Sequence, residues 1–372
     1  MRVLELCLSP DLGGLELYAL RAAEALGASG PTVMAVAPDG LLRPRAEGLG
    51  LAARLVARPR IPLAPGAVRA LAGLLDEVRP EIVHVHWARD LPLAVAARGL
   101  SRSRPRIVHT RQMAITRPKR DPYHAAVYRR LDLILAITRR LAADLRRFLP
   151  PECAGRIRTL YYGVPAPQGL NRASVRRAVR ARLGVPAEAF LVGLFGRIEA
   201  FKGQHLLVEA VESLRAQGRA VHGLIVGRAM EPGYLEDLRR RVAAAGLDVH
   251  FLDFVEDPQR YMAACDCVAL TTVEETFGLV LPEAMRVGVA VVGSDRGGVP
   301  EIIDDGETGL LFRSGDAASL AAAIARLHDD PGLRSRLAAA GKAKADRMFD
   351  EAAHFRALRG ILAGLVSAGS AR

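Results

Sequence analysis

The sequence predicts an α/β protein made of two Rossmann-like, doubly wound domains that face each other across a deep interdomain cleft. Its length of 372 residues suits two domains of ordinary size. Short apolar runs alternate with longer amphipathic stretches, which is typical of βα units and parallel sheets. The alternation is interrupted once, by a stretch rich in glycine and proline, and then restarts. We therefore expect two domains in tandem with one linker.

The first domain is expected to span residues 1–165. Helices are predicted over Leu15–Leu26 and Arg139–Phe148, and the hydroxyl of Thr138 suits the N-cap of the second of these. Six apolar runs in this half predict strands, namely Val3–Leu8, Thr32–Ala37, Glu81–Val85, Arg106–Thr110, Leu133–Ile137 and Arg156–Tyr161.

Residues 166–186 predict the linker, because Pro167, Gly169 and Pro186 flank a short basic helix. The second domain is expected at 187–345, and a C-terminal helix at 346–372 is expected to pack back on the first domain. Helices are predicted over Gln204–Gln217 and Leu235–Ala245. Five strands are expected, namely Phe190–Phe195, Val221–Val226, His250–Phe254, Cys267–Thr271 and Ala290–Gly293.

The composition predicts a cytoplasmic protein. Half of the residues are hydrophobic, and no run of about 18 apolar residues could form a membrane span. Residues Met1–Leu8 lack the long apolar core and the cleavage site of a signal peptide. The four cysteines have neither zinc-site nor disulfide-framework spacing, so reduced thiols are expected.

The positive charge is confined to the first half. Residues 1–165 hold 26 Lys and Arg against 14 Asp and Glu, which equals the net charge of +12 for the whole chain. Within this half, the segment Arg98–Arg120 has eight basic residues and no acidic one. Such a patch favours an anionic partner or peripheral contact with an anionic membrane, although a solvated basic face is the alternative.

One loop of the second half is suited to a diphosphate. A predicted strand ends at Phe195, and Arg197 and Lys202 follow before the next helix begins. Arginine can bind an anion bidentately, lysine acts as a point charge, and a helix amino end favours negative groups. Exposed loop cations are usually only solvated, so this motif is weak by itself.

A second motif pairs two carboxylates. Glu275 and Glu283 are separated by seven residues and follow the predicted strand Cys267–Thr271. Gly278 lies where a loop would turn into a helix over Leu279–Val287, whose unpaired amides favour a phosphate. Glu283 could bind ribose hydroxyls and Glu275 the hydroxyls of a sugar. The alternative for both is a solvated surface acid.

The turn after the first strand carries Gly13, Gly14 and Glu16. Two glycines allow close approach of a ligand to the backbone, and the helix amino end favours phosphate. The spacing is not the G-x-G-x-x-G of a dinucleotide site, so a nicotinamide cofactor is not expected. We expect Glu16 to face the acceptor side of the cleft.

Polar residues end two further strands of the first half. His86 ends one strand, and Arg111 and Gln112 end another, so we expect all three to line the acceptor side of the cleft. His84 and His109 alternate with apolar neighbours, which favours hydrogen bonding within the sheet for these two histidines.

Together these segments resemble the retaining glycosyltransferase family 4 (group 1), which has the GT-B fold. The resemblance covers nearly the whole chain. Residues 13–16 resemble the glycine loop of the family, residues 196–203 its pyrophosphate-binding loop, and residues 275–283 its E-x7-E element. The segments 288–292 and 297–309 match the family in order and spacing.

The resemblance implies a retaining enzyme that moves a sugar from a nucleotide-diphosphate donor in the C-terminal domain to an acceptor on the N-terminal domain. Arg197, Lys202 and helix amides would stabilise the leaving diphosphate, so neither a metal nor a cofactor is expected, and Glu275 would orient the sugar. The implied donor site comprises Gly13, Gly14, Arg197, Lys202, Glu275, Phe277, Gly278, Leu279 and Glu283.

The implied acceptor is a glycan or glycolipid of the cell envelope, such as lipopolysaccharide or capsule, and the charge favours an anionic one. Gln112 departs from the family, which often has histidine there, and glutamine cannot act as an acid or base. The alternatives are a nucleotide-sugar epimerase or hydrolase, and a non-catalytic nucleotide-sugar-binding protein. Nucleic acid is not an expected partner, because no recognition signature accompanies the basic patch.

Overall fold

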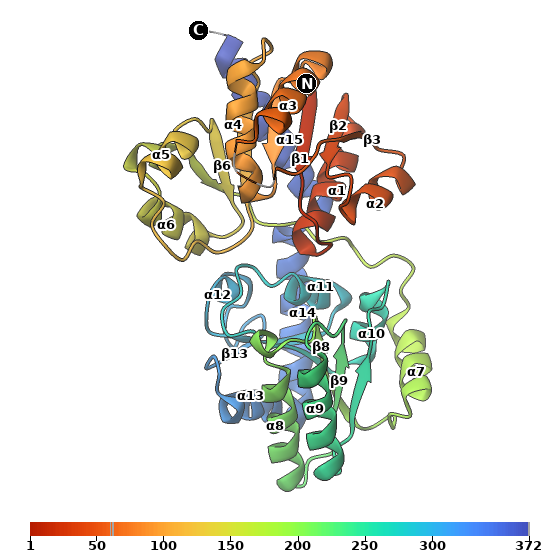
Figure 1. Cartoon of the computed structure of the whole chain (residues 1–372). Coiled ribbons are helices and arrows are strands. Elements are labelled where there is room, and N and C mark those ends of the chain that lie inside the picture. The colour runs from red at the N-terminus through yellow and green to blue at the C-terminus, as the bar shows by residue number, and fades with distance from the viewer. Residues whose placement is uncertain (60, 62, 371–372) are drawn as a thin grey trace. The chain divides into compact units, whose positions relative to one another are not determined.

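The structure is a computed structural model that describes residues 1–59, 61 and 63–370. The chain divides into two compact units (Figure 1). The first unit is formed by Met1–Tyr161 together with Ala352–Arg372, and the second by Tyr162–Glu351. Each unit is built around one parallel sheet with helices packed against it, so the predicted α/β class with two doubly wound sheets is confirmed.

The sheet of the first unit has seven strands in the order β3-β2-β1-β4-β5-β6-β7. The order reverses between β1 and β4, which is the topological switch point at which open α/β sheets bind ligands. The strands are β1 (Val3–Cys7), β2 (Thr32–Val36), β3 (Ala52–Leu55), β4 (Ile82–Val85), β5 (Arg106–Arg111), β6 (Leu133–Ala136) and β7 (Ile157–Thr159).

The helices of the first unit lie on both faces of this sheet, because right-handed crossovers in opposite directions from β1 require opposite faces. Helices α3 and α4 lie side by side (Figure 1). The helices are α1 (Gly14–Gly27), α2 (Leu42–Gly48), α3 (Pro65–Val78), α4 (Leu91–Leu100), α5 (Pro122–Tyr128), α6 (Arg139–Phe148) and all but the first residue of α15 (Glu351–Ser370), with 3₁₀ turns at Ala88–Asp90 and Pro151–Arg156.

The sheet of the second unit has six strands in the order β10-β9-β8-β11-β12-β13, and its switch point lies between β8 and β11. The strands are β8 (Phe190–Phe195), β9 (Val221–Val226), β10 (Val249–Leu252), β11 (Cys267–Leu270), β12 (Ala290–Ser294) and β13 (Leu310–Phe312).

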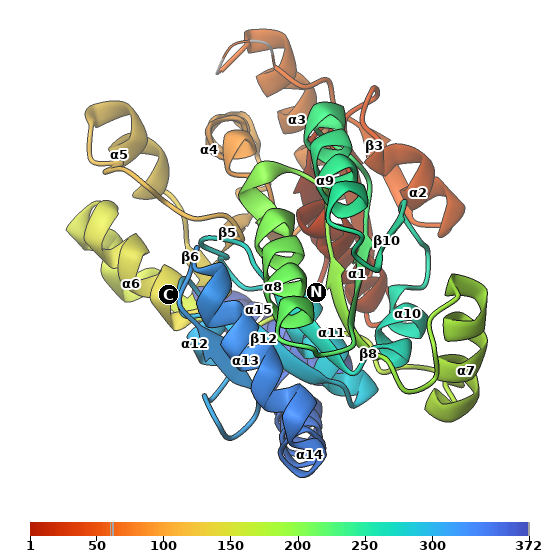
Figure 2. The same ribbon diagram turned by 90° about the horizontal axis from the view of Figure 1, so that it is seen from below.

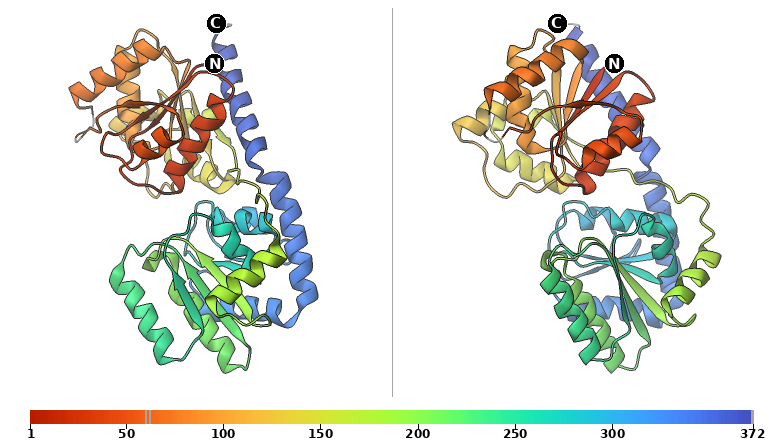
Figure 3. Two further views of the ribbon diagram at one scale, coloured as in Figure 1. Left: turned by 90° about the vertical axis from the view of Figure 1, so that its right-hand side faces the viewer. Right: turned by 45° about the vertical axis from the view of Figure 1, so that its right-hand side comes forward.

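The main core of the second unit lies between its sheet and the helices α8, α9 and α13. Helices α8 and α9 run side by side (Figure 3), and α7 lies beside α10 (Figure 2). The helices are α7 (Arg172–Leu183), α8 (Gln204–Ala216), α9 (Pro232–Ala244), α10 (Pro258–Ala264), α11 (Val280–Val287), α12 (Val299–Ile302), α13 (Ala317–Asp329) and α14 (Pro331–Met348), with a 3₁₀ turn at Ala200–Lys202.

Most predicted elements lie within two residues of their expected bounds, and the hydroxyl of Thr138 caps α6 by accepting the Leu141 N–H at 3.1 Å. Strands β3 and β13 were not predicted. Three of the four residues of β3 are exposed, so it lacks an apolar run, and β13 has only three residues. In the described part of the chain, no helix is both long enough and apolar enough to cross a bilayer.

Candidate active site

The loops after β8 and β11 meet at the switch point of the second sheet. The Thr271 hydroxyl donates a hydrogen bond to the carbonyl of Lys202 at 2.7 Å. Gly203 has a φ of +71°, and a Cβ there would lie 2.6 Å from the Thr271 carbonyl oxygen. Only glycine allows this close approach without strain, so the sequence Lys-Gly fixes how the two loops pack.

The two loops are also joined by an ion pair. The Nζ of Lys202 lies 2.8 Å from Oε2 of Glu275, and each side chain is 21% exposed. The sequence assigned separate roles to these residues, a diphosphate for Lys202 and sugar hydroxyls for Glu275. The structure brings the ammonium and the carboxylate into direct contact, so a ligand that bound either one would lie next to the other.

The backbone of Glu275 is fixed from the loop after β12. The N–H of Gly298 donates to the Glu275 carbonyl at 2.8 Å. Gly297 has a φ of +66°, and a Cβ there would lie 2.1 Å from the same oxygen. The glycine pair of this loop therefore holds Glu275 at the carboxyl edge of the sheet.

Among the charged residues of the predicted donor site, Arg197 is the most exposed. Its side chain is 60% exposed and pairs with Glu199 at 3.0 Å, while its carbonyl accepts the Gln204 amide at 2.8 Å. Among the described residues, the buried Gln204 Oε1 and Thr272 Oγ1 have no hydrogen-bond partner. Buried polar atoms are normally paired, so these two mark the loops after β8 and β11 as places where a polar ligand would be stabilised.

The remaining predicted donor residues of this unit surround the amino end of α11. Gly278 has a φ of +91°, Leu279 is the N-cap residue, and Glu283 lies in the first turn and is partly buried. Phe277 is buried and packs edge-on against Tyr162, with ring centroids 5.3 Å apart. The buried ring of Phe277 therefore supports the loop that precedes α11.

Gly13, Gly14 and Glu16 lie at the switch point of the first sheet. Gly13 is the N-cap of α1, and Oε2 of Glu16 accepts the Gly13 N–H at 2.8 Å, which is the glutamate half of a capping box. Glu16 is 6% exposed. Its carboxylate thus stabilises the glycine turn, and a ligand contact for it stays a prediction.

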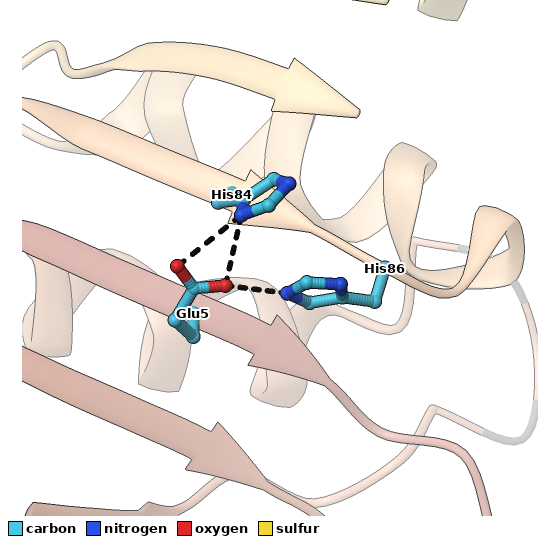
Figure 4. Close-up of side chains that lie close together, drawn as sticks. All are labelled: Glu5, His84 and His86. Atoms are coloured by element: carbon cyan, nitrogen blue, oxygen red, sulfur yellow. Dashed lines mark hydrogen bonds and ion pairs between the residues drawn. The ribbon is translucent and has the colours of Figure 1, made fainter. Parts of the chain in front are cut away.

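A buried polar network crosses β1, β4 and β5, and Glu5 is its centre (Figure 4). The carboxylate of Glu5 accepts hydrogen bonds from Nδ1 of His84, 2.9 Å from Oε2, and from Nε2 of His86. The second nitrogen of His84 lies 2.6 Å from the Thr110 hydroxyl, and that of His86 lies 3.5 Å from the Gln112 amide nitrogen. These contacts are all satisfied by neutral imidazoles.

The electrostatics of the network agree with one negative charge on Glu5. Burial alone would raise the pKa of this carboxyl, but the contacts with His84 and His86 outweigh it and lower the pKa to about 2. Burial lowers the pKa of His86. Glu5 therefore fixes the tautomer of both histidines, and His86 in turn orients Gln112.

Glu5, His84 and His86 also have ligand atoms close enough together for a metal ion. The distance of 2.9 Å between His84 and Glu5 is that of a direct charge-assisted hydrogen bond, and each outer nitrogen has its own partner. We interpret the trio as a hydrogen-bonded network. The expectation that the protein needs no metal stays a prediction.

A pocket of about 700 Å³ opens in the first unit beside the same switch point. This volume is that of small-molecule sites. Its walls come from the ends of β1, β4 and β5 and from α5, and are formed by Pro10, Arg58, Pro59, Trp87, Ala88, Arg89, Asp90, Leu91, Pro92, Arg111, Lys119, Tyr123, His124, Val127 and Tyr128.

The cations of this pocket differ in how they are held. Arg58 pairs with Asp39 at 2.8 Å, and the guanidinium of Arg89 lies over the Trp87 ring, 5.3 Å from its centroid. Arg111 donates to the carbonyls of Met113 and Ala114, both at 2.6 Å. Lys119 Nζ lies 3.1 Å from Nε2 of His124, and burial, with Arg117 and Arg111 nearby, lowers its pKa. The pocket is therefore strongly basic.

The structure places the residues that the sequence assigned to the acceptor side in different surroundings. Arg111 is the last residue of β5 and Gln112 follows it, and successive side chains of an extended backbone point in opposite directions. Arg111 accordingly lines the basic pocket, whereas Gln112 and His86 belong to the network around Glu5. Sequence reasoning missed Glu5 and Asp90. An acid inside the apolar run Val3–Cys7 was the available signal for Glu5.

Two family profiles match the chain. The family described as Glycosyltransferase Family 4 matches residues 12–166, and the family described as Glycosyl transferases group 1 matches residues 175–344.

Among curated relatives, D-inositol 3-phosphate glycosyltransferase of Corynebacterium efficiens is 37% identical over 177 residues, which cover 45% of this chain and 41% of the relative. The enzyme of the same name from Xylanimonas cellulosilytica is 32% identical over 231 residues, which cover 60% and 55%. The chain spans about half the length of the curated relatives it matches.

Among solved structures, HepE of Anabaena in complex with UDP has a TM-score of 0.86 and 26% identity, covering 98% of this chain and 100% of that chain. WaaG, a glycosyltransferase involved in lipopolysaccharide biosynthesis, has a TM-score of 0.72 at 17% identity, covering 98% and 100%, and shares the fold. With family profiles over both units and a whole-chain match to GT-B structures, the chain belongs to the group 1 glycosyltransferases of the GT-B fold.

Proposed function

We propose that this protein transfers a sugar from a uridine diphosphate sugar to an acceptor, with retention of the anomeric configuration. The observation that carries the proposal is the Lys202–Glu275 ion pair at the switch point of the second sheet. It combines a cation for a diphosphate with a carboxylate for sugar hydroxyls at one place. The complexes of HepE with UDP and with UDP-glucose support the choice of donor.

The chemistry follows from the charge that develops as the glycosidic bond breaks. The leaving diphosphate becomes more negative, and Lys202, Arg197 and the amides at the amino end of α11 would stabilise it. The ion pair with Glu275 already restrains the Lys202 side chain, which lowers the entropy lost when a donor binds. Glu275 would orient the sugar ring for attack by the acceptor on the face that the diphosphate leaves.

We propose that these cations replace a divalent metal. Two side-chain cations and helix amides compensate the charge of a diphosphate without a bound ion. The expected result is that EDTA leaves both the UDP affinity and the transfer rate unchanged within twofold. A loss that Mg²⁺ or Mn²⁺ restores would contradict this part of the proposal.

The acceptor is proposed to be anionic. The basic pocket of the first unit supports this choice, because its described lining residues include Arg58, Arg89, Arg111 and Lys119 but one acid, Asp90. The curated relatives named for D-inositol 3-phosphate support a phosphorylated acceptor. A phosphorylated glycan or glycolipid of the cell envelope has the same chemistry.

Contact with an anionic membrane is proposed as a second use of the charge. Residues 1–165 carry the whole net charge of +12, and basic residues near an anionic surface each contribute about 1 kcal/mol. Vesicles that contain anionic lipid should co-sediment with the protein at 50 mM salt and release it at 500 mM. Equal sedimentation with neutral vesicles would contradict this.

The donor site is tested by thermal stabilisation with UDP, GDP, ADP and CMP at about 1 mM. A ligand present at 100 times its dissociation constant stabilises a protein by about 2.7 kcal/mol, which is a shift of several degrees for a chain of this size. UDP should stabilise the wild type more than the other nucleotides do, and Arg197→Gln should remove the shift. Arg313→Gln is the matched control, because Arg313 is an exposed arginine of the same unit outside this site.

The transfer step is tested with UDP-glucose and candidate acceptors, and the anomeric configuration of the product is read by NMR. Formation of a product with the donor configuration supports the proposal. Donor turnover that needs no acceptor would instead support a hydrolase or epimerase. UDP stabilisation without any turnover would support a binding protein.

A further inference from the structure

Asp90 is the one acid among the described lining residues of the basic pocket. It is 1% exposed and precedes α4, where an aspartate normally caps the helix. Its side chain makes no such cap. Instead, Oδ2 accepts the N–H of Leu8 at the end of β1, at 2.8 Å. In the part of the chain that the structure describes, Oδ1 has no hydrogen-bond donor, and the carboxyl has no ion-pair partner within 4 Å.

A buried carboxyl without a cation in contact is costly. Burial raises the pKa of Asp90 to about 7, although the Leu8 N–H and the charge of Arg58 oppose this shift. Near neutral pH both protonation states are populated, and both can bind a hydroxyl, as an acceptor from it or as a donor to it. The chemistry of Asp90 therefore fits a neutral polyol better than it fits an anion.

Arg111 and Lys119 have the opposite chemistry. Two carbonyl contacts fix the guanidinium of Arg111, and Lys119 contacts Nε2 of His124. Neither has an ion-pair partner within 4 Å in the described part of the chain, in contrast to Arg58, which is paired with Asp39. A fixed arginine beside a lysine suits a phosphate.

We propose that this pocket binds a small polyol phosphate, with the phosphate on Arg111 and Lys119 and the ring hydroxyls on Asp90. The Arg89 guanidinium lies over the indole ring of Trp87 and restrains it. The apolar face of a polyol ring could pack against this indole. The inference rests on the proposed function in one respect, because it identifies the ligand as the acceptor. Asp90 is then the residue that selects a hydroxylated phosphate over a bare anion.

The test is a titration of the full-length protein without donor, followed by the fluorescence of Trp87, which is the single tryptophan of the chain and lines the pocket. The probes are inorganic phosphate, myo-inositol, D-inositol 3-phosphate and glucose 6-phosphate. At least one of the two polyol phosphates should bind ten times more tightly than inorganic phosphate and than myo-inositol. Equal affinity for polyol phosphates and inorganic phosphate, or no binding of either, would overturn the inference.

The variants separate the two halves of the pocket. Asp90→Asn keeps an oxygen for the Leu8 N–H, and it should reduce the advantage of the polyol phosphate over inorganic phosphate to under threefold. Arg111→Gln should weaken inorganic phosphate itself at least tenfold. Asp144→Asn, the same change on α6 outside the pocket, should alter neither. An unchanged advantage in Asp90→Asn would contradict the role of Asp90.

Two arrangements keep the inference testable. If Asp90→Asn does not fold, the comparison of the four probes on the wild type still decides whether hydroxyls contribute. Because the titrations need no donor, failure of UDP binding or of transfer would overturn the proposed function and leave a positive titration standing. UDP binding without binding of a polyol phosphate would overturn this inference and leave the proposed function standing.

Discussion

At the scale of single residues, Lys202 connects two loops of the second unit by two different bonds. Its ammonium contacts Glu275 after β11, and its carbonyl accepts the Thr271 hydroxyl at the end of that same strand. The side chain is therefore oriented by an acid, while the backbone is held independently of it. Removing the ammonium should alter the chemistry of the site more than its architecture.

Lys202→Met should weaken UDP binding at least tenfold while changing the free energy of unfolding by less than about 1 kcal/mol, because a partly exposed ion pair contributes little to stability. UDP titration and urea unfolding measure the two effects. Lys342→Met is the control, since Lys342 forms an exposed pair with Asp346 in the same unit. UDP affinity within twofold of the wild type would contradict the assignment of Lys202.

The sequence predicted the residues of the donor site but not the contact between two of them. The types and spacing of Arg197, Lys202, Glu275 and Glu283 were sufficient to propose a donor site, because the local order strand, loop, helix brings cations and amides together. The Lys202–Glu275 contact was not predicted, because it joins residues 73 positions apart. Only the pairing of β8 with β11 brings them together.

At the scale of elements, Glu5 links three neighbouring strands. β1 carries the carboxylate, β4 and the residue just after it carry the two histidines, and β5 with its next residue carries Thr110 and Gln112. Register decides these contacts, since Glu5 pairs with His84 and His84 with Val108 in the sheet. A network of this kind fixes strand register as well as side-chain orientation.

Glu5→Gln should destabilise the first unit by about 1–3 kcal/mol, because the neutral amide removes the charge that strengthens the hydrogen bonds from both imidazoles. Unfolding in urea, followed by Trp87 fluorescence, measures this. The ¹⁵N shifts of His84 and His86 should also change, because both imidazoles lose their contact with the negative charge. Glu77→Gln, an exposed acid of α3, should leave both unchanged. An unaltered ¹⁵N spectrum would contradict the network.

Gly297→Ala tests the loop that holds Glu275. A residue other than glycine at a φ of +66° costs roughly 1–2 kcal/mol, and here the added Cβ would also meet the Glu275 carbonyl oxygen at 2.1 Å. Gly306→Ala is the matched control, since its φ is +75° and its Cβ would meet nothing within 4 Å. The first variant should lose more stability in urea unfolding and also weaken UDP-glucose binding. Equal losses would contradict the packing argument.

At the scale of the whole molecule, the buried histidines should destabilise the folded state as the pH is lowered, because the fold holds them neutral. Burial lowers the pKa of His109 to about 3 and that of His354 to about 4. Nδ1 of each donates to a carbonyl, of Val85 and of Tyr161. Between these values and the unfolded value of 6.5, only the unfolded chain binds the proton, so acid favours unfolding.

At pH 5.0, each of the two histidines should cost about 2 kcal/mol relative to pH 7.5. Asp90, whose pKa burial raises to about 7, takes up a proton in the folded state over the same interval and opposes this loss by about 2–3 kcal/mol. Urea unfolding at the two pH values, read by Trp87, therefore measures the net change for the first unit. His109→Gln should shift this net change by about 2 kcal/mol in favour of pH 5.0. His328→Gln, on α13 of the second unit, should leave it unchanged. A pH dependence of His109→Gln equal to that of the wild type would contradict the buried neutral state of His109.

The fold class, most strands and several helices could be predicted from the sequence, and the donor motifs could be proposed from it, because each of these depends on periodicity and on residues close together in the chain. Contacts that depend on strand order came only from the folded arrangement. It joined Lys202 to Glu275, placed Arg111 in the basic pocket and Gln112 in the buried network, and gave Glu5 its two histidines. It also assembled the basic pocket with Asp90 from the ends of three strands and a helix. These are contacts between distant segments, and only the packed sheet brings their side chains within bonding distance.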